Sequence, residues 1–167
     1  MADLATLNRV SVDAFVEQLG HIAEDSPFIA RKAAKDRPFA DRTALIAAFE
    51  RALREADAQT QLAVLCAHPD LAGKLDIAEA SRREQKGAGL DSLSPTERER
   101  FRRLNTAYRE RFGFPFIFAV KGATKHQILE AFERRLPRDE ATERHEALAQ
   151  VATIMRWRLM EAVADRP

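Results

Sequence analysis

The sequence predicts an all-α protein, a single-domain helical bundle of about seven to nine helices with an extended apolar segment near residues 114–120. Apolar residues recur at helical spacing almost throughout, and capping residues or proline precede several of the apolar runs. Of the 167 residues, 46% are apolar and 32% are charged, which is typical of a soluble globular protein with one core. We therefore expect one domain over residues 1–167.

Four helices are predicted in the first half of the chain, where capping residues precede apolar residues at helical spacing. A break or bend is expected near Asp57, between the third helix and the fourth. The expected signals are Ser11 and Gly20 around residues 12–19, Ser26–Pro27 before 28–33, Thr43 before the run through Leu53, and the run with Leu62 and Leu65 that stops at His68.

The second half of the chain contains four more predicted helices. Ser94-Pro95-Thr96-Glu97 has the spacing of a capping box with proline in the first turn, and Gly113 ends the helix that follows. Arginines and glutamates are interleaved along this helix, which favours a solvated face with intrahelical pairs over a nucleic-acid surface. The remaining predicted helices cover about residues 76–86, the stretch from Thr124 to Pro137, and about residues 139–164.

Residues 114–120 form the longest apolar run, and Phe114 precedes a proline, which disfavours helical geometry there. No partner strand is visible, so we expect an extended linker through the core. Its peptide groups lack helical partners. They are therefore either part of plain core filling or available to a bound polar heterocycle, and the residues alone leave both open.

The net charge of +1 provides no overall field for nucleic acid or an anionic membrane. The single cysteine excludes an intrachain disulfide, and no H-E-x-x-H motif, with two histidines at i,i+4, occurs, so we expect no metal. No apolar run approaches the ~20 residues of a membrane span, and the start of the chain lacks a secretion signal. A cytoplasmic enzyme is expected, with His21, His126 and His145 at its surface.

His68, Glu84 and Gln85 stand out as candidate functional residues. His68 precedes Pro69, so its backbone leaves the helix and its imidazole can point into a cleft. A buried or capping histidine is the default for His68 alone. At about 100° per residue, Ser81 and Glu84 fall on an apolar face, where polar groups need partners. An imidazole, a carboxylate, an amide and a hydroxyl together suit proton-transfer chemistry.

Arg158 interrupts the apolar stripe of the last helix, between Val151 and Ile154 in the helical projection. A guanidinium among core residues must pair with an anion, because its burial is otherwise very costly. Three interpretations remain open. Arg158 forms a salt bridge with Glu84 or another core-facing carboxylate, extends outwards to solvent, or holds a carboxylate or carbonyl of a substrate.

These residues lie in a chain that resembles 2-oxo-4-hydroxy-4-carboxy-5-ureidoimidazoline (OHCU) decarboxylase, the last enzyme of the route from urate to allantoin. The matching pieces follow one another in order from about residue 10 to residue 164. They are Glu24-Asp25-Ser26-Pro27, Arg37-Pro38-Phe39, His68-Pro69-Asp70-Leu71-Ala72, Ser81-x-x-Glu84-Gln85, Gly87-Ala88-Gly89-Leu90, Leu104-Asn105-x-x-Tyr108, Phe112-Gly113-Phe114-Pro115-Phe116-Ile117 and Arg158-Leu159.

The resemblance implies an all-α homodimer that needs no cofactor, converts OHCU to (S)-allantoin, and is functionally coupled to urate oxidase and hydroxyisourate hydrolase. It implies that His68, Glu84 and Arg158 are catalytic. The implied substrate-binding residues are Pro69, Ser81, Arg82, Arg83, Glu84, Gln85, Phe116, Ile117, Phe118, Ala119, Val120 and Arg158. Two alternatives are a family member that acts on another carboxylated heterocycle and a non-enzymatic helical module that binds an acidic partner through the arginines of residues 98–109.

Overall fold

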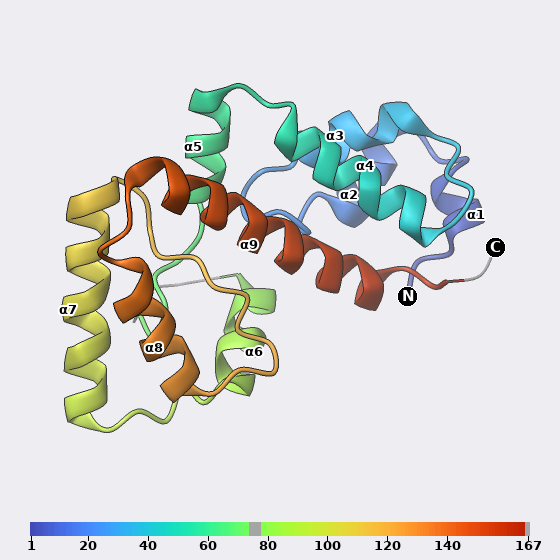
Figure 1. Cartoon of the computed structure of the whole chain (residues 1–167). Helices are drawn as coiled ribbons and strands as arrows, with labels where there is room; N and C mark the ends of the chain where they lie inside the picture. Colours follow the sequence, from blue (N-terminus) through green and yellow to red (C-terminus); the bar gives the residue numbers. More distant parts are fainter. Residues whose placement is uncertain (74–77, 166–167) are drawn as a thin grey trace. The chain divides into compact units, whose positions relative to one another are not determined.

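The computed structural model describes residues 1–73 and 78–165. This part of the chain contains nine α-helices, one 3₁₀-helix and no strand, so the all-α prediction is confirmed (Figure 1). The helices are α1 Leu4–Leu7, α2 Val12–Leu19, α3 Phe28–Ala33, the 3₁₀-helix Ala34–Asp36, α4 Arg42–Arg54, α5 Ala58–Cys66, α6 Glu79–Gly87, α7 Pro95–Phe112, α8 Lys125–Arg135 and α9 Glu140–Ala162.

The first of two compact units combines residues 1–67 with the chain from Val151 onward. Helix α3 packs against α2 and α4, and the ring of Phe15 lies 6.2 Å from that of Phe39 and 6.5 Å from that of Phe49. The two ends of the chain are joined here, because the Ala2 N–H donates to the Ala162 carbonyl at 2.6 Å. The terminal part of α9 is thereby fixed within this unit.

The second unit contains residues 68–150, with α6, α7, α8 and the beginning of α9. Helix α7 packs against α8. Residues 115–120 lie in neither a helix nor a strand, and Phe116 and Ile117 are buried. The ring of Phe116 stacks on that of Phe132 and meets that of Tyr108 edge-on. The expected extended segment through the core is confirmed. A single domain over residues 1–167 stays a prediction.

Local capping signals account for most helix boundaries. Capping boxes at Ser94 and Thr124 are present, and Gly113 ends α7 with a φ of 76°, a left-handed conformation that favours glycine. Two expected caps are wrong. The Ser26 hydroxyl donates to the Glu24 carbonyl instead of capping α3, and Asp41, rather than Thr43, caps α4. The predicted start of a helix near residue 76 lies outside the described residues.

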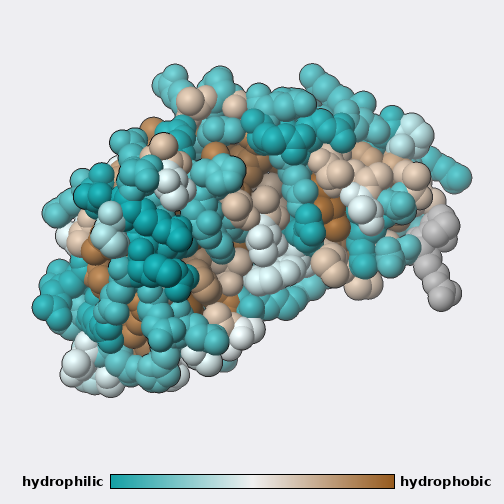
Figure 2. All heavy atoms as spheres, in the orientation of Figure 1, coloured by the Kyte–Doolittle hydropathy of each residue, from teal (hydrophilic) through white to brown (hydrophobic). Residues whose placement is uncertain are grey.

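Hydrophilic residues cover most of the face shown in Figure 2, and apolar residues emerge there in small separate patches. Among the described residues, Met1 and Met160 are the exposed large apolar side chains. No described helix combines the length and the apolar character needed to cross a membrane. His21, His126 and His145 are exposed, as the sequence predicts.

The capping box of α7 predicts a pH-dependent stability. Hydrogen bonds from the Lys125 ammonium and the Ser94 N–H lower the pKa of Glu97 from its ordinary 4.5 to about 2. The stabilisation is therefore complete above pH 4.5 and is lost as the pH falls toward 2. We expect Glu97→Gln to lower the melting temperature at pH 7 but not near pH 2. An equal difference at both pH values would contradict this; Glu110→Gln on the same helix is the control.

Candidate active site

His68 follows the end of α5, where Ala67 forms the C-cap, and it is 6% exposed. The proline at position 69 prevents the helix from continuing through His68. The imidazole is therefore on a non-helical segment, buried among other side chains. This placement agrees with the expectation from the sequence, which put His68 at a helix end.

Three side chains fasten the segment that follows His68. The Ala72 N–H donates to Gln85 Oε1 at 3.0 Å, Asn105 Nδ2 donates to the Leu71 carbonyl at 2.8 Å, and Arg109 Nε donates to Asp70 Oδ1 at 2.8 Å. Ala72 has a φ of 60°, a conformation that an L residue adopts only when its surroundings impose it. The segment from 68 to 72 is therefore held against α6 and α7 in a defined conformation.

Helix α6 presents the polar residues that the sequence analysis singled out. Ser81 and Gln85 are buried, at 5% and 8% exposure, and Glu84 is half-buried. Arg82 and Arg83 are exposed. Because Gln85 Oε1 accepts the Ala72 N–H, the structure brings the helix of Glu84 and the segment of His68 together. It does not bury the two arginines with them.

The extended segment is also held by side chains. The Ile117 carbonyl accepts a hydrogen bond from Arg135 at 2.7 Å, and the Ala119 N–H donates to Gln150 Oε1 at 2.8 Å. Among the described residues, no hydrogen bond engages the peptide groups of Phe118, and this side chain is half-buried. The two peptide groups that flank Phe118 are therefore each held at one end, by the Ile117 carbonyl and by the Ala119 N–H, while no described residue engages the N–H or the carbonyl of Phe118 itself.

Sequence reasoning missed a buried polar cluster formed by Arg135, Glu143 and Tyr108, which we call the Arg135 cluster. The hydroxyl of Tyr108 donates to Glu143 Oε1 at 2.6 Å, and Arg135 Nε donates to the same oxygen at 2.5 Å. Burial, together with the Glu143 hydrogen bond, raises the pKa of Tyr108 well above its usual range. A periodicity test would have found Arg135, which follows Ile128 and Phe132 on the apolar stripe of α8.

Arg158 belongs to the first unit, where it is 5% exposed, so its predicted position inside the apolar stripe of α9 is confirmed. Its NH1 donates to the Ile22 carbonyl at 3.2 Å and lies 3.5 Å from Glu24 Oε2. Glu24 is itself 4% exposed. Glu24 is therefore a core-facing carboxylate beside Arg158, as the salt-bridge interpretation of Arg158 predicts.

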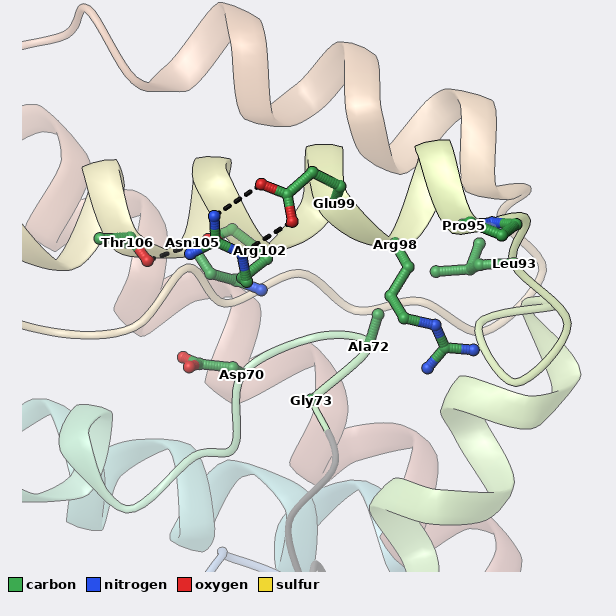
Figure 3. Close-up of a pocket in the computed structure, with 10 residues that line it drawn as sticks. All are labelled: Asp70, Ala72, Gly73, Leu93, Pro95, Arg98, Glu99, Arg102, Asn105 and Thr106. Atoms are coloured by element: carbon green, nitrogen blue, oxygen red, sulfur yellow. Dashed lines mark hydrogen bonds and ion pairs between the residues drawn. The ribbon is translucent and has the colours of Figure 1, made fainter.

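A cavity of about 610 Å³ opens between α7 and the segment from Asp70 to Gly73 (Figure 3). Arg102 on its wall is bound by both oxygens of Glu99, at 2.9 and 2.6 Å. Asn105 lines the cavity as well, and it also holds the Leu71 carbonyl. None of the predicted site residues is among those that line this cavity.

The family model of OHCU decarboxylase matches residues 8–160. The chain belongs to this family. A Haloferax volcanii protein named 2-oxo-4-hydroxy-4-carboxy-5-ureidoimidazoline decarboxylase is 46% identical over 158 residues, which cover 95% of this chain and 94% of that protein. The family resemblance read from the sequence is therefore confirmed.

Solved structures share the fold of this OHCU decarboxylase family member. A crystal structure of (S)-allantoin synthase has a TM-score of 0.77 and 30% identity, and the match covers 97% of this chain but 54% of that one. A crystal structure of OHCU decarboxylase in the presence of (S)-allantoin has a TM-score of 0.71 and 20% identity, with 84% and 93% covered. The second likeness concerns the fold alone.

Ser81, Glu84 and Gln85 on α6 contribute a hydroxyl, a carboxylate and an amide to the candidate site of this OHCU decarboxylase family member. Across residues 1–73 and 78–165, no group of three histidine, cysteine, aspartate or glutamate side chains is arranged to hold a metal ion. The roles of the individual residues stay predictions.

Proposed function

We propose that this chain is a carboxy-lyase that converts OHCU to (S)-allantoin in urate degradation without a cofactor. The observation that carries the proposal is the hydrogen bond from the Ala72 N–H to Gln85 Oε1. This bond fastens the segment after His68 to the helix that bears Glu84. An imidazole and a carboxylate that are held on fixed elements can carry out general acid–base catalysis.

The reaction breaks the bond between a ring carbon and its carboxylate, and CO₂ leaves. The electron pair of that bond passes into the adjacent C–N double bond of the substrate, so the ring serves as its own electron sink. One face of the resulting enol-like intermediate must then receive a proton. We assign this proton, and that of the neighbouring hydroxyl, to His68. We assign Glu84 to orienting the imidazole of His68.

Substrate binding is assigned to polar side chains and to the extended segment. Ser81 and Gln85 hydrogen-bond the ureido group or the ring amides. Because Gln85 Oε1 accepts the Ala72 N–H, we assign the NH₂ group of Gln85 to the substrate. The backbone N–H and carbonyl of Phe118 hydrogen-bond the flat ring of the substrate. Arg158 holds a carbonyl or the carboxylate of the substrate. The proposed set is completed by Pro69, Arg82, Arg83, Phe116, Ile117, Ala119 and Val120.

The test of the activity supplies the protein with urate, urate oxidase and hydroxyisourate hydrolase, and follows the circular dichroism of the allantoin formed. Rapid appearance of one enantiomer is expected, because the enzyme delivers the proton to one face. A slow, racemic product, equal to that formed without the protein, would remove the proposal. A salt-sensitive complex with an acidic partner and no turnover would favour a binding module instead.

Arg158→Lys is expected to raise the apparent KM for OHCU roughly tenfold or more, because lysine lacks the planar fork that binds a carboxylate through two parallel hydrogen bonds. Initial rates at graded urate concentrations, with the two coupling enzymes in excess, give this value. Arg156→Lys is the matched control, since Arg156 is exposed and pairs with Glu50. An unchanged KM would show that Arg158 does not bind the substrate and instead serves the fold, through contacts that include those with Ile22 and Glu24.

We also propose that the protein works as a homodimer in the cytoplasm, after urate oxidase and hydroxyisourate hydrolase. Its function is assigned to a single OHCU decarboxylase-like domain over residues 1–167. The family match over residues 8–160 supports one domain, because it spans both compact units. A mass near 18.8 kDa in light scattering would contradict the dimer.

A further inference from the structure

The Arg135 cluster is the most deeply buried set of charges among the described residues. The side chains of Arg135 and Glu143 are 2% and 0% exposed, and Tyr108 is 0% exposed. Glu143 Oε1 accepts from both Arg135 Nε and the Tyr108 hydroxyl. One carboxylate oxygen therefore receives two donors from two different helices, α7 and α8.

Stability alone is a weak reason for such a cluster. Removing two charges from water costs several kcal/mol per ion, and well-packed apolar residues of similar volume often do as well or better. The cluster also leaves Arg135 NH2 and Glu143 Oε2 buried without a hydrogen-bond partner among the described residues, although Arg138 NH1 lies 3.8 Å from Glu143 Oε2. What the cluster adds is a directed contact. Arg135 NH1 donates to the Ile117 carbonyl at 2.7 Å.

This contact replaces the backbone pairing that the extended segment lacks. Residues 115–120 have no strand beside them in the described chain, so no ladder sets their conformation. Arg135 holds the Ile117 carbonyl, and its guanidinium carbon lies 4.3 Å from the centre of the Phe116 ring. Gln150 holds the Ala119 N–H at 2.8 Å. The peptides on both sides of Phe118 are thus fixed.

We infer that Arg135, oriented by Glu143 and Tyr108, is a positioning residue that holds the peptide of Phe118 in place for the substrate heterocycle. The inference rests on the proposed function, in which the backbone of Phe118 hydrogen-bonds the substrate ring. Arg135 is buried and donates to the Ile117 carbonyl, so we expect it to act through Ile117 and not on the reacting atoms. Its effect should appear in substrate affinity more than in the chemical step.

Arg135→Lys provides the test. Lysine keeps the buried positive charge, but a single ammonium cannot reproduce a fork that bonds Glu143 and Ile117 in fixed directions. We expect the apparent KM for OHCU generated in situ to rise about tenfold, and kcat to change less than about threefold, since the lost contact serves ground state and transition state alike. Arg134→Lys, at the neighbouring exposed position, is expected to change neither.

Tyr108→Phe is the second variant, because it removes one donor to Glu143 without altering the charge of the cluster. It is expected to raise KM in the same direction by a smaller factor, and it covers the case in which Arg135→Lys does not fold. A lower melting temperature with unchanged KM in the variants that fold would overturn the positioning role. If His68→Asn still abolishes turnover in that case, the proposed function stands; if His68→Asn is fully active, the proposed site itself fails.

Discussion

His68→Asn lowers the turnover of OHCU by at least about 100-fold, because one general acid–base group is typically worth 10²–10⁴ in rate. Asparagine retains hydrogen-bonding groups in the buried position, so the variant should remain folded. It cannot exchange a proton near neutral pH, so protonation of the intermediate is left to water. The initial rate of (S)-allantoin formation, followed by circular dichroism, measures the loss, and the melting temperature reports the fold.

The control for this prediction is His126→Asn, which changes an exposed histidine at the start of α8. It should leave the rate unchanged. Near-normal turnover in His68→Asn would exclude His68 from proton transfer, whatever the family relationship of the chain. A large loss of rate in both variants would point to a general effect of the substitution and not to the position of His68.

The fold could be predicted where the determinants are local. The capping box of Ser94 and the stop at Gly113 both follow from residues within one turn, and both are confirmed. The cap at Ser26 was wrong because its hydroxyl bonds the Glu24 carbonyl, a choice between competing local partners. Asp41 was overlooked in favour of Thr43, although aspartate caps helices at least as well.

The burial of candidate-site residues could be predicted where it follows from helical spacing, whereas their contacts with distant residues could not. A charged residue inside an apolar stripe is visible in the sequence, and Arg158 was found in this way and is buried. Its neighbour Glu24 is separated by 134 positions, so their proximity is not a property of either local sequence. The hydrogen bond between Gln85 and Ala72 is likewise non-local. Gln85, which the sequence predicts to bind substrate, therefore also holds the segment that follows His68.

Glu143→Leu is expected to destabilise the protein by about 3–5 kcal/mol, because it leaves the buried guanidinium of Arg135 without its anion. At about 2–4 °C per kcal/mol for a chain of this size, the melting temperature should fall by roughly 6–20 °C. Tyr108 loses the acceptor of its hydroxyl at the same time. Thermal unfolding followed by circular dichroism measures the shift, and Glu140→Leu on the exposed first turn of α9 is the control.

The destabilisation by Glu143→Leu has two possible causes, the unpaired charge of Arg135 and the loss of packing, and a second variant separates them. If the unpaired charge dominates, Glu143→Leu combined with Arg135→Met should be more stable than Glu143→Leu alone, since replacing both partners of a buried pair by apolar residues is often neutral or stabilising. The double variant should nevertheless bind substrate poorly, because the Ile117 carbonyl has lost its donor. A double variant no more stable than the single one would assign the destabilisation to packing, and one with normal substrate affinity would separate the Arg135 cluster from the site.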